Sequence, residues 1–198
     1  MSRDEVVAVG ARTILRYPTR ADRDEIIALI DGSRDFLEQY APMPREHDAL
    51  WRMCISETRT GDSHKLFVCR AEDGAITGRI AISNILRRKL QSANLGYWLG
   101  APFEGQGLMT EAMRMTVRFA FMGLQLHRVE ACIQPGNERS IALATRCGMR
   151  YEGFSPKLVE IGGVWCDHER YAITVEHWRT LAGDVRAEDA TLNLPSSV

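Results

Sequence analysis

The sequence predicts one mixed α+β domain, and three observations support this prediction. The chain has 198 residues, which is enough for one hydrophobic core and short for two. Short segments rich in β-branched and aromatic residues alternate with segments whose apolar residues recur at helical spacing. In chain order these segments are a strand, helices, three strands, a helix, a strand, a helix and two strands. The centre therefore reads β-α-β-α-β, which is typical of a sheet covered by helices.

We expect a flexible leader over residues 1–10, a single domain over 11–182 and a mobile tail over 183–198. The predicted elements of the domain are a strand over 13–17, helices over 22–30, 36–40 and 46–59, three strands within 65–99, a helix over 108–122, a strand over 128–133, a helix over 140–146, strands over 149–159 and 164–174, and a helix over 176–181.

Turn-forming residues and apolar spacing justify these limits. Pro18 closes the first strand, Asp22 can cap the first helix and Gly32 can end it. The strands within 65–99 are short, β-rich and separated by turn signals, which predicts an antiparallel meander. From Leu108 to Met122 the apolar positions step by four, three, four and three, which indicates one face of a long helix.

The composition excludes several classes of function. The formal net charge is −1, whereas a general nucleic-acid binder is usually clearly basic, so we expect no direct nucleic-acid binding. The five cysteines are scattered and form no CxxC pair, so neither a metal site nor a disulfide framework is predicted. Because a signal peptide and a run of about eighteen apolar residues are both missing, we expect a cytoplasmic protein without membrane attachment.

The run LGYWLGAPFEGQGLMTEA over residues 95–112 carries the strongest functional signal. A strand enters a turn at Gly105 and Gly107, and a helix begins there. Glycines allow backbone N–H groups to converge, and the positive end of a helix favours an anion such as a diphosphate. A dinucleotide-binding GxGxxG motif is excluded by Thr110, and the Walker A lysine is missing. A tight turn without a ligand stays open as the alternative for this fragment.

A second signal covers residues 127–149, where a strand, a turn, an Asn-x-x-Ser pattern and a short helix follow one another. If the strands ending near 99 and 133 are parallel and splay apart, their facing backbone groups stay unpaired. A ligand that carries amides could pair with those groups as an added strand does.

Residues 11–180 resemble the GNAT superfamily of N-acetyltransferases, and most of all its RimJ/RimL type, which acetylates the N-termini of ribosomal proteins. The matching text is LGYWLG, the Gly105-x-Gly107 turn, HRVEA, PGNERS, the step from Cys147 to Met149, and GxWxDxxxY from Gly163. The resemblance implies a twisted, mostly antiparallel sheet of about seven strands, splayed between the fourth and fifth strands and flanked by helices. It also implies acetyl-CoA as co-substrate and no metal.

The resemblance further implies which residues hold acetyl-CoA. The turn at Gly105 would present the backbone amides of Gln106, Gly107, Leu108, Met109 and Thr110 to the pyrophosphate. The backbone near Leu99 would pair with the pantetheine arm, with Asn137 close to it. Ser140 would face the thioester sulfur. Pro102 stands where the family has Arg or Gln, so one contact of the family is missing here.

The catalytic residues match the family less well. Ala144 stands at the position of the family's tyrosine acid, so Ser140 is the acid candidate, with a role as helix N-cap as the alternative. Asn94 replaces a strand glutamate that often serves as base. Glu130 is then the named base candidate, with a salt-bridged structural role as the alternative. Glu160, Glu104 and a water relay also stay open.

Three functions remain open at this point. The first is acetylation of a protein or peptide N-terminus, with an acceptor groove between residues 31–48 and 157–165. The second is acetylation of a small amine such as a polyamine, an amino acid or an antibiotic, in a closed acidic pocket. The third is a coenzyme A-binding sensor or assembly module without turnover. A homodimer is an alternative to a monomer, and Trp98, Trp165 and Trp178 are interpreted as structural.

Overall fold

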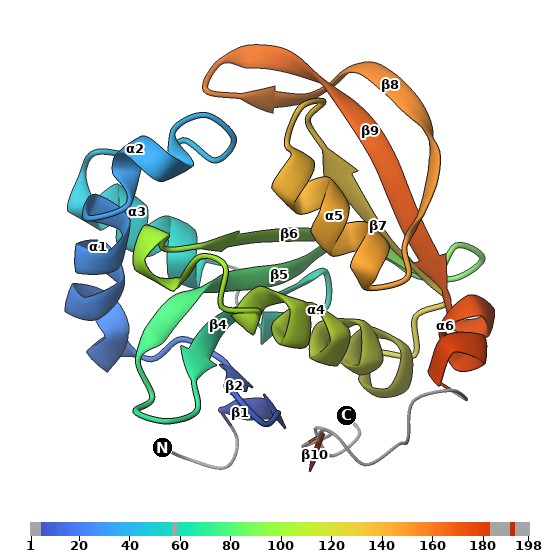
Figure 1. The fold of residues 1–198 in the computed structure, drawn as a ribbon, viewed down its shortest axis with the longest axis horizontal. Helices are drawn as coiled ribbons and strands as arrows, with labels where there is room; N and C mark the ends of the chain where they lie inside the picture. Colours follow the sequence, from blue (N-terminus) through green and yellow to red (C-terminus); the bar gives the residue numbers. More distant parts are fainter. Residues whose placement is uncertain (1–4, 57–58, 183–190, 193–198) are drawn as a thin grey trace.

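The computed structural model describes residues 5–56, 59–182 and 191–192. The strands are β1 (Val6–Val9), β2 (Thr13–Arg16), β3 (Arg59–Thr60), β4 (Ser63–Arg70), β5 (Ile76–Leu86), β6 (Ser92–Leu99), β7 (Arg128–Ile133), β8 (Arg150–Ile161), β9 (Val164–Thr174) and β10 (Thr191–Leu192). The helices are α1 (Arg23–Asp31), α2 (Arg34–Leu37), α3 (His47–Ile55), α4 (Leu108–Arg118), α5 (Glu138–Arg146) and α6 (Val175–Ala182). Figure 1 shows how they are arranged.

All strands of the described part join one sheet in the order β10-β1-β2-β4-β5-β6-β7-β9-β8, with β3 paired to β4. Every neighbouring pair is antiparallel except β6 and β7, which are parallel. Parallel strands need a crossover connection, and α4 supplies it. The predicted fold class, a mixed and mostly antiparallel sheet flanked by helices, is confirmed.

The expected flexible leader over residues 1–10 is wrong for its second half. Val6–Val9 form β1, which pairs with β2 on one side and with β10 on the other. Val7 and Ala8 are buried against α4 in the core. Thr191 and Leu192, within the expected tail, form β10; residues 183–190 and 193–198 of that tail lie outside the described part.

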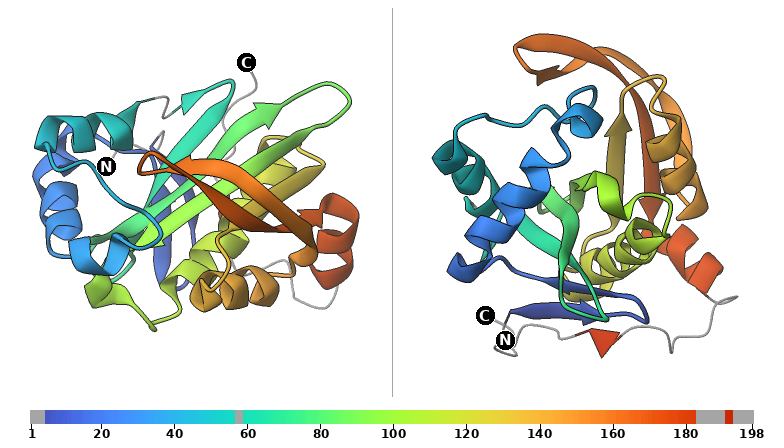
Figure 2. Two further views of the ribbon diagram at one scale, coloured as in Figure 1. Left: turned by 90° about the horizontal axis from the view of Figure 1, so that it is seen from above. Right: turned by 60° about the vertical axis from the view of Figure 1, so that its left-hand side comes forward.

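Two hydrophobic clusters cover the two faces of the sheet. The larger cluster packs α4 and α5 on one face, against alternate residues of β4, β5, β6 and β7. The smaller cluster packs α1, α2 and α3 on the opposite face, over Phe67 of β4 and Trp98 of β6. Figure 2 shows these two groups of helices from two further sides. We call these the α4 face and the α1–α3 face.

Asp22 does not cap α1 as predicted, although it stands at the N-cap position. Its carboxylate makes no capping hydrogen bond to α1. It accepts hydrogen bonds from Arg16 at 2.7 Å and from the Thr19 N–H at 2.6 Å instead. A buried guanidinium needs a nearby acid more than a helix end needs one more acceptor, since an unpaired buried charge is very costly.

The predicted splay lies between β6 and β7. Their ladder covers three residue pairs and ends at Asn94 and Glu130. Beyond that point β6 stays paired with β5 as far as Leu99, and β7 stays paired with β9 as far as Ile133. In Figure 1, β6 runs toward α1–α3 whereas β7 rises toward the hairpin of β8 and β9. The two strands therefore leave a gap between residues 95–99 and 131–133.

Candidate active site at the diverging strands

The turn before α4 has the geometry of an anion site. Gly105 and Gly107 have φ angles of +71° and +77°, which only glycine adopts without strain. Gly107 is the N-cap of α4. Within the described part of the chain, the N–H groups of Gln106, Gly107, Leu108 and Met109 have no hydrogen-bond acceptor. These N–H groups are the unsatisfied donors that a helix start offers to an anion.

Thr110 differs from the other four predicted contacts. Its N–H donates to the Gly107 carbonyl oxygen at 3.1 Å, and its Oγ1 accepts a hydrogen bond from Arg146 at 3.3 Å. Arg146 of α5 therefore reaches the start of α4. Its guanidinium adds positive charge on one side of the glycine turn.

Two more arginines stand around this turn. Arg139 of α5 forms an ion pair with Glu104 at 2.5 Å, which offsets the negative charge of Glu104 beside the anion site. Arg12 approaches from the β1–β2 turn, where its Nη1 lies 3.6 Å from the position that a Cβ atom on Gly107 would take. Sequence analysis missed Arg12, because its place near the turn depends on the unpredicted strand β1.

Glu111 holds the β1–β2 turn against the first turn of α4. Its carboxylate accepts hydrogen bonds from the N–H of Ala11 at 2.7 Å, the N–H of Arg12 at 3.0 Å and the hydroxyl of Thr13 at 2.6 Å. A Cβ atom on Gly10 would lie 2.7 Å from Glu111 Oε1, so a larger residue there would displace this carboxylate. An acidic residue in a first helical turn is also favoured by the helix dipole.

The first turn of α5 forms the opposite side of the gap. Asn137 is the N-cap, and its Oδ1 accepts a hydrogen bond from the Ser140 N–H at 3.2 Å. The alternative of Ser140 as N-cap is therefore wrong. Ser140 is half-buried, and its hydroxyl lies within hydrogen-bonding range of the Tyr97 hydroxyl.

Tyr97 of β6 crosses the gap to α5, a contact that no motif of the sequence predicts. Its hydroxyl donates to the Ser140 carbonyl oxygen at 3.4 Å. Burial raises the pKa of Tyr97 to about 12, so the phenol stays protonated at neutral pH. Leu99, at the end of β6 on the same face, pairs with Gly78 of β5 and leaves its other edge toward the gap.

The carboxylates named as base candidates differ in their partners and in their exposure to solvent. Glu130 accepts a hydrogen bond from Arg128 Nε at 2.8 Å, and Arg128 also pairs with Glu152. This arrangement matches the salt-bridged alternative for Glu130. Glu160 is exposed on β8, near the tip of the hairpin. Ala144 is fully buried, so nothing at that position can replace the family's tyrosine.

On the α1–α3 face the segment 38–46 reaches across the gap. Tyr40 donates its hydroxyl to the Gly136 carbonyl oxygen at 3.0 Å, and Gln134 donates to the Tyr40 carbonyl oxygen at 3.4 Å. A Cβ atom on Gly162, at the tip of the β8–β9 hairpin, would lie 3.8 Å from Pro42. The two segments predicted to border an acceptor groove, 31–48 and 157–165, therefore meet. Figure 2 shows the β8–β9 hairpin arching toward the segment that follows α2.

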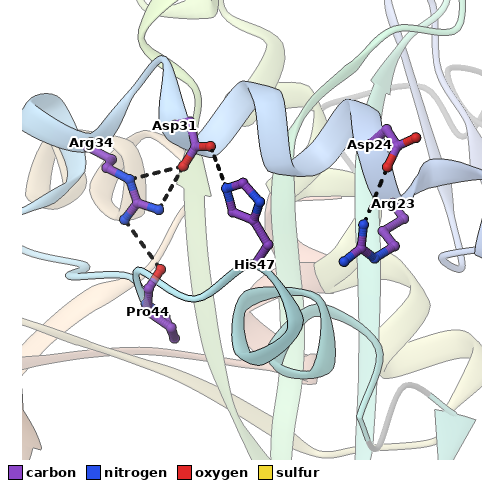
Figure 3. A network of polar contacts seen from close by, with 6 residues as sticks. All are labelled: Arg23, Asp24, Asp31, Arg34, Pro44 and His47. Carbon is purple, nitrogen blue, oxygen red and sulfur yellow. Dashed lines mark hydrogen bonds and ion pairs between the residues drawn. The ribbon is translucent and has the colours of Figure 1, made fainter.

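A polar network fixes this segment on α1. Asp31 accepts hydrogen bonds from Arg34 at 2.7 Å and from His47 at 2.9 Å, while Arg34 also donates to the Pro44 carbonyl oxygen at 3.3 Å (Figure 3). Burial acts to raise the pKa of Asp31, but the hydrogen bonds from Arg34 and His47 outweigh it and hold the pKa below its ordinary value. The wall of the acceptor side is therefore tied to α1, α2 and α3 together.

Within the described residues, no group of three or more His, Cys, Asp or Glu side chains could hold a metal ion. No helix of that part is long and apolar enough to cross a membrane.

Comparisons with known proteins agree with this geometry. Residues 12–150 match the family described as acetyltransferase (GNAT) domain. The chain is 34% identical over 174 residues to the alanine N-acetyltransferase of ribosomal protein uS5 from Escherichia coli, covering 84% of this chain and 90% of that protein. It is 36% identical over 160 residues to the probable N-acetyltransferase YjcK of Bacillus subtilis, covering 77% and 88%.

Among solved structures, Mycobacterium smegmatis RimJ in complex with CoA-disulfide is similar with a TM-score of 0.77 and 26% identity, over 95% of each chain. A ribosomal-protein-serine acetyltransferase from Vibrio cholerae is similar with a TM-score of 0.76 and 26% identity, over 88% of this chain and 99% of that one. The chain belongs to the GNAT family of N-acetyltransferases, and its relatives include the RimJ/RimL ribosomal-protein acetyltransferases.

Proposed function

We propose that this enzyme transfers the acetyl group of acetyl-CoA to the N-terminal α-amine of a protein or peptide. The observation that carries the proposal is the run of unpaired N–H groups at the start of α4, beside a gap between β6 and β7. The first feature fits a diphosphate, and the second fits an extended arm that carries amides. Acetyl-CoA combines both.

In this proposal, the amides from Gln106 to Met109 hold the pyrophosphate, with Gly105 setting the turn; the Thr110 N–H, which donates to the Gly107 carbonyl oxygen, is left out of this set. The pantetheine arm lies in the gap, along the backbone near Leu99 and close to Asn137. The thioester then reaches the first turn of α5, where the hydroxyls of Ser140 and Tyr97 stand close together. Arg12 and Arg146 add positive charge around the phosphates.

The chemistry needs little from the protein beyond placement. The neutral amine nitrogen attacks the thioester carbon, the carbon–sulfur bond breaks, and the amine nitrogen loses its proton to water. The sulfur leaves as a thiolate, which takes a proton from the Ser140 hydroxyl, and solvent then returns that proton to Ser140. Since a thiol has a pKa of about 8.5, this acid contributes only modestly.

The protonation of the amine favours an N-terminal acceptor. Deprotonating a lysine with a pKa of about 10.4 costs roughly 4–5 kcal/mol at pH 7, whereas an α-amine with a pKa of about 7.8 costs roughly 1 kcal/mol. Glu130 is tied to Arg128, which leaves it poorly suited to serve as a strong base. A site of this kind serves an α-amine best, and the uS5 acetyltransferase is named for an acceptor of that type.

A small amine is the second candidate. The contacts of Tyr40 with Gly136, and the approach of Gly162 to Pro42, narrow the entrance on the acceptor side. A narrow entrance favours a small molecule or only the first residue of a peptide.

The test is acetyl-CoA turnover with defined acceptors, measured as release of free thiol. The panel holds a peptide with a free N-terminal alanine and one internal lysine, the same peptide with a blocked N-terminus, and spermidine. We expect thiol release with the free peptide only, and mass spectrometry should place the acetyl group on its α-amine. Acetylation of spermidine alone would favour the second candidate. Binding of acetyl-CoA without turnover on any amine would favour a coenzyme A sensor and overturn the proposal.

A further inference from the structure

A row of four side chains crosses the α1–α3 face of the sheet. In register, Arg16 of β2 lies opposite Phe67 of β4, Phe67 opposite Arg79 of β5, and Arg79 opposite Trp98 of β6. Phe67 and Trp98 belong to the core cluster under α1, α2 and α3. The row therefore places two arginines side by side with a buried aromatic core.

The two arginines differ in their partners. Arg16 donates two hydrogen bonds of 2.7 Å to Asp22 and lies 5.8 Å above the Phe67 ring. Arg79 has no hydrogen bond, ion pair or aromatic stacking with any residue of the described part, and its Nε is fully buried. Burial lowers the pKa of Arg79, whose only named charge partner is the thiol of Cys54. Arg79 as a residue is half-buried, and its Nε is the atom that is buried without a partner; a buried donor without an acceptor is costly for the folded state.

Trp98 repeats this pattern on the neighbouring strand. The residue is 9% exposed, and its Nε1 is buried without an acceptor among the described residues. A buried indole N–H usually finds a partner. Arg79 and Trp98 are directly opposite each other, so two unsatisfied donors of the same face are adjacent. Such a pair is suited to bind an oxygen anion.

The end of the row borders the gap between β6 and β7. Side chains alternate along a strand, so Gly96 and Asn94 share the face of Trp98. Asn94 is the last residue of β6 paired with β7. Gly96 is exposed, and a Cβ atom on it would meet nothing within 4 Å, which indicates open space. Two residues of a strand span roughly 6.6 Å, so Gly96 and Trp98 are neighbours on this face.

We propose that Arg79 and Trp98 bind a carboxylate that the amine acceptor itself carries. This inference rests on the proposed function, since it needs the amine near Gly96 at the gap. A planar guanidinium receives a carboxylate through two parallel hydrogen bonds, and the indole N–H adds a third donor. The acceptor class is an amine with a carboxylate a few bonds away. That carboxylate is an acidic side chain near a peptide N-terminus or the acid group of a small amino acid.

Matched acceptors test the proposal. One pair is the peptide Ala-Asp-Ala-amide against Ala-Asn-Ala-amide, and the other is β-alanine against β-alaninamide. For the wild-type enzyme we expect kcat/KM to be at least about tenfold higher for the acid in one of the pairs, chiefly through KM, since one added charged hydrogen-bond pair is worth such a factor. The pair that shows the preference distinguishes the peptide source from the small-molecule source.

The variants are Arg79→Met and Trp98→Phe, with the exposed Arg52→Met on α3 as the control. Arg79→Met should bring the ratio between acid and amide close to one. Trp98→Phe should reduce the ratio by a few-fold, since it removes only the N–H. Arg52→Met should keep the wild-type ratio.

Thermal unfolding of the ligand-free enzyme gives a second readout that does not depend on turnover. Arg79→Met should raise the Tm, because it removes a buried donor without a partner, whereas Arg16→Met should lower it by leaving Asp22 unpaired. If Arg79→Met lowers the Tm as well, Arg79 is structural and the inference is overturned.

The outcomes separate the two proposals. Acetylation of the neutral peptide with no preference in either pair overturns the carboxylate site and leaves the proposed function intact. Failure to acetylate any acceptor overturns the proposed function, and the carboxylate site with it.

Discussion

At the first turn of α5, the side-chain oxygen of Asn137 accepts the Ser140 N–H, so the Ser140 hydroxyl is not used as the helix cap and lies near the Tyr97 hydroxyl instead. A hydroxyl used as a cap would point along the helix and be occupied. Here it is half-buried beside Tyr97, whose own hydroxyl is spent on the Ser140 carbonyl oxygen. In the proposed mechanism, Ser140 is the residue that we expect to protonate the thiolate leaving group.

Ser140→Ala should lower kcat for acetyl transfer by roughly three- to thirtyfold and change acetyl-CoA affinity less than twofold. The reason is that proton donation matters in the transition state, whereas backbone amides hold the cofactor. Steady-state thiol release and calorimetric binding measure the two quantities. Thr145→Ala on the same helix is the control, because its hydroxyl bonds to the Ile141 carbonyl oxygen and faces solvent. An unchanged kcat would remove Ser140 from the mechanism.

The sequence predicted that Asn137 and Ser140 lie at the site, but it did not predict which of the two caps α5. In an Asn-x-x-Ser pattern either side chain can cap a helix, so the sequence alone left the role of Ser140 open. Arg79 and Trp98 were missed for another reason. They stand out because each has a buried N–H group without a hydrogen-bond acceptor among the described residues. The sequence does not show that Asp22 accepts hydrogen bonds from Arg16 and not from Arg79.

At the scale of elements, the turn before α4 needs glycine at position 107 because of its backbone φ angle, and not because a side chain would clash there. A Cβ atom on Gly107 would meet only Arg12 Nη1, at the ordinary contact distance of 3.6 Å. The φ of +77° is nevertheless unfavourable for any other residue, and most for a β-branched one. A substitution there should therefore turn the amides away from the phosphates while leaving the core intact.

Gly107→Val should weaken acetyl-CoA binding by at least about tenfold, since it costs more than 1 kcal/mol at the binding conformation. The control is Gly74→Val in the β4–β5 turn, which has the same φ of +77° and open space around it. Both variants should lose similar stability in thermal unfolding. Only Gly107→Val should lose affinity in calorimetry, and equal affinities for the two variants would contradict the assignment of this turn to the pyrophosphate.

The strands and helices whose apolar residues recur at a clear period were predictable from the sequence. Short strands such as β1 were not. The run Val6–Val9 looked like a leader, because four apolar residues give no period to read. Its strand identity comes from pairing with β2 and from the contact of the β1–β2 turn with Glu111, about a hundred residues later in the chain. Through that contact β1 also sets the place of Arg12 beside the glycine turn.

For the whole molecule, the candidate active site is a gap that two halves of one sheet leave open. The half built on β4–β6 brings the glycine turn, and the half built on β7–β9 brings α5. Contacts that cross the gap, such as Arg139 with Glu104 and Tyr40 with Gly136, keep the halves at a fixed separation. The sequence predicted the gap from motif order, but these crossing contacts lie between surface residues with no motif.

In the proposed mechanism this site positions the reactants, and the acceptor amine loses its proton to water, which determines the expected pH dependence. The rate should follow the fraction of unprotonated acceptor amine, so kcat/KM should rise about tenfold per pH unit and level off near the pKa of the amine. A peptide α-amine should level off near pH 8, and an alkylamine with a pKa of about 10.4 should still be rising at pH 9.5. The phenol of Tyr97, whose burial raises its pKa to about 12, should cause no fall in this range.

Thiol release at saturating acetyl-CoA from pH 6 to 10, with circular dichroism to verify folding, measures these profiles for both acceptors. If both acceptors give the same midpoint, a group of the protein takes the proton and the water route is wrong. Glu130→Gln then identifies that group: a loss of roughly a hundredfold, with the ascending limb gone, would make Glu130 the base despite its ion pair with Arg128. We expect Glu130→Gln to lower the rate less than fivefold and the two amines to keep different midpoints, because the Glu130 carboxylate is already paired with Arg128.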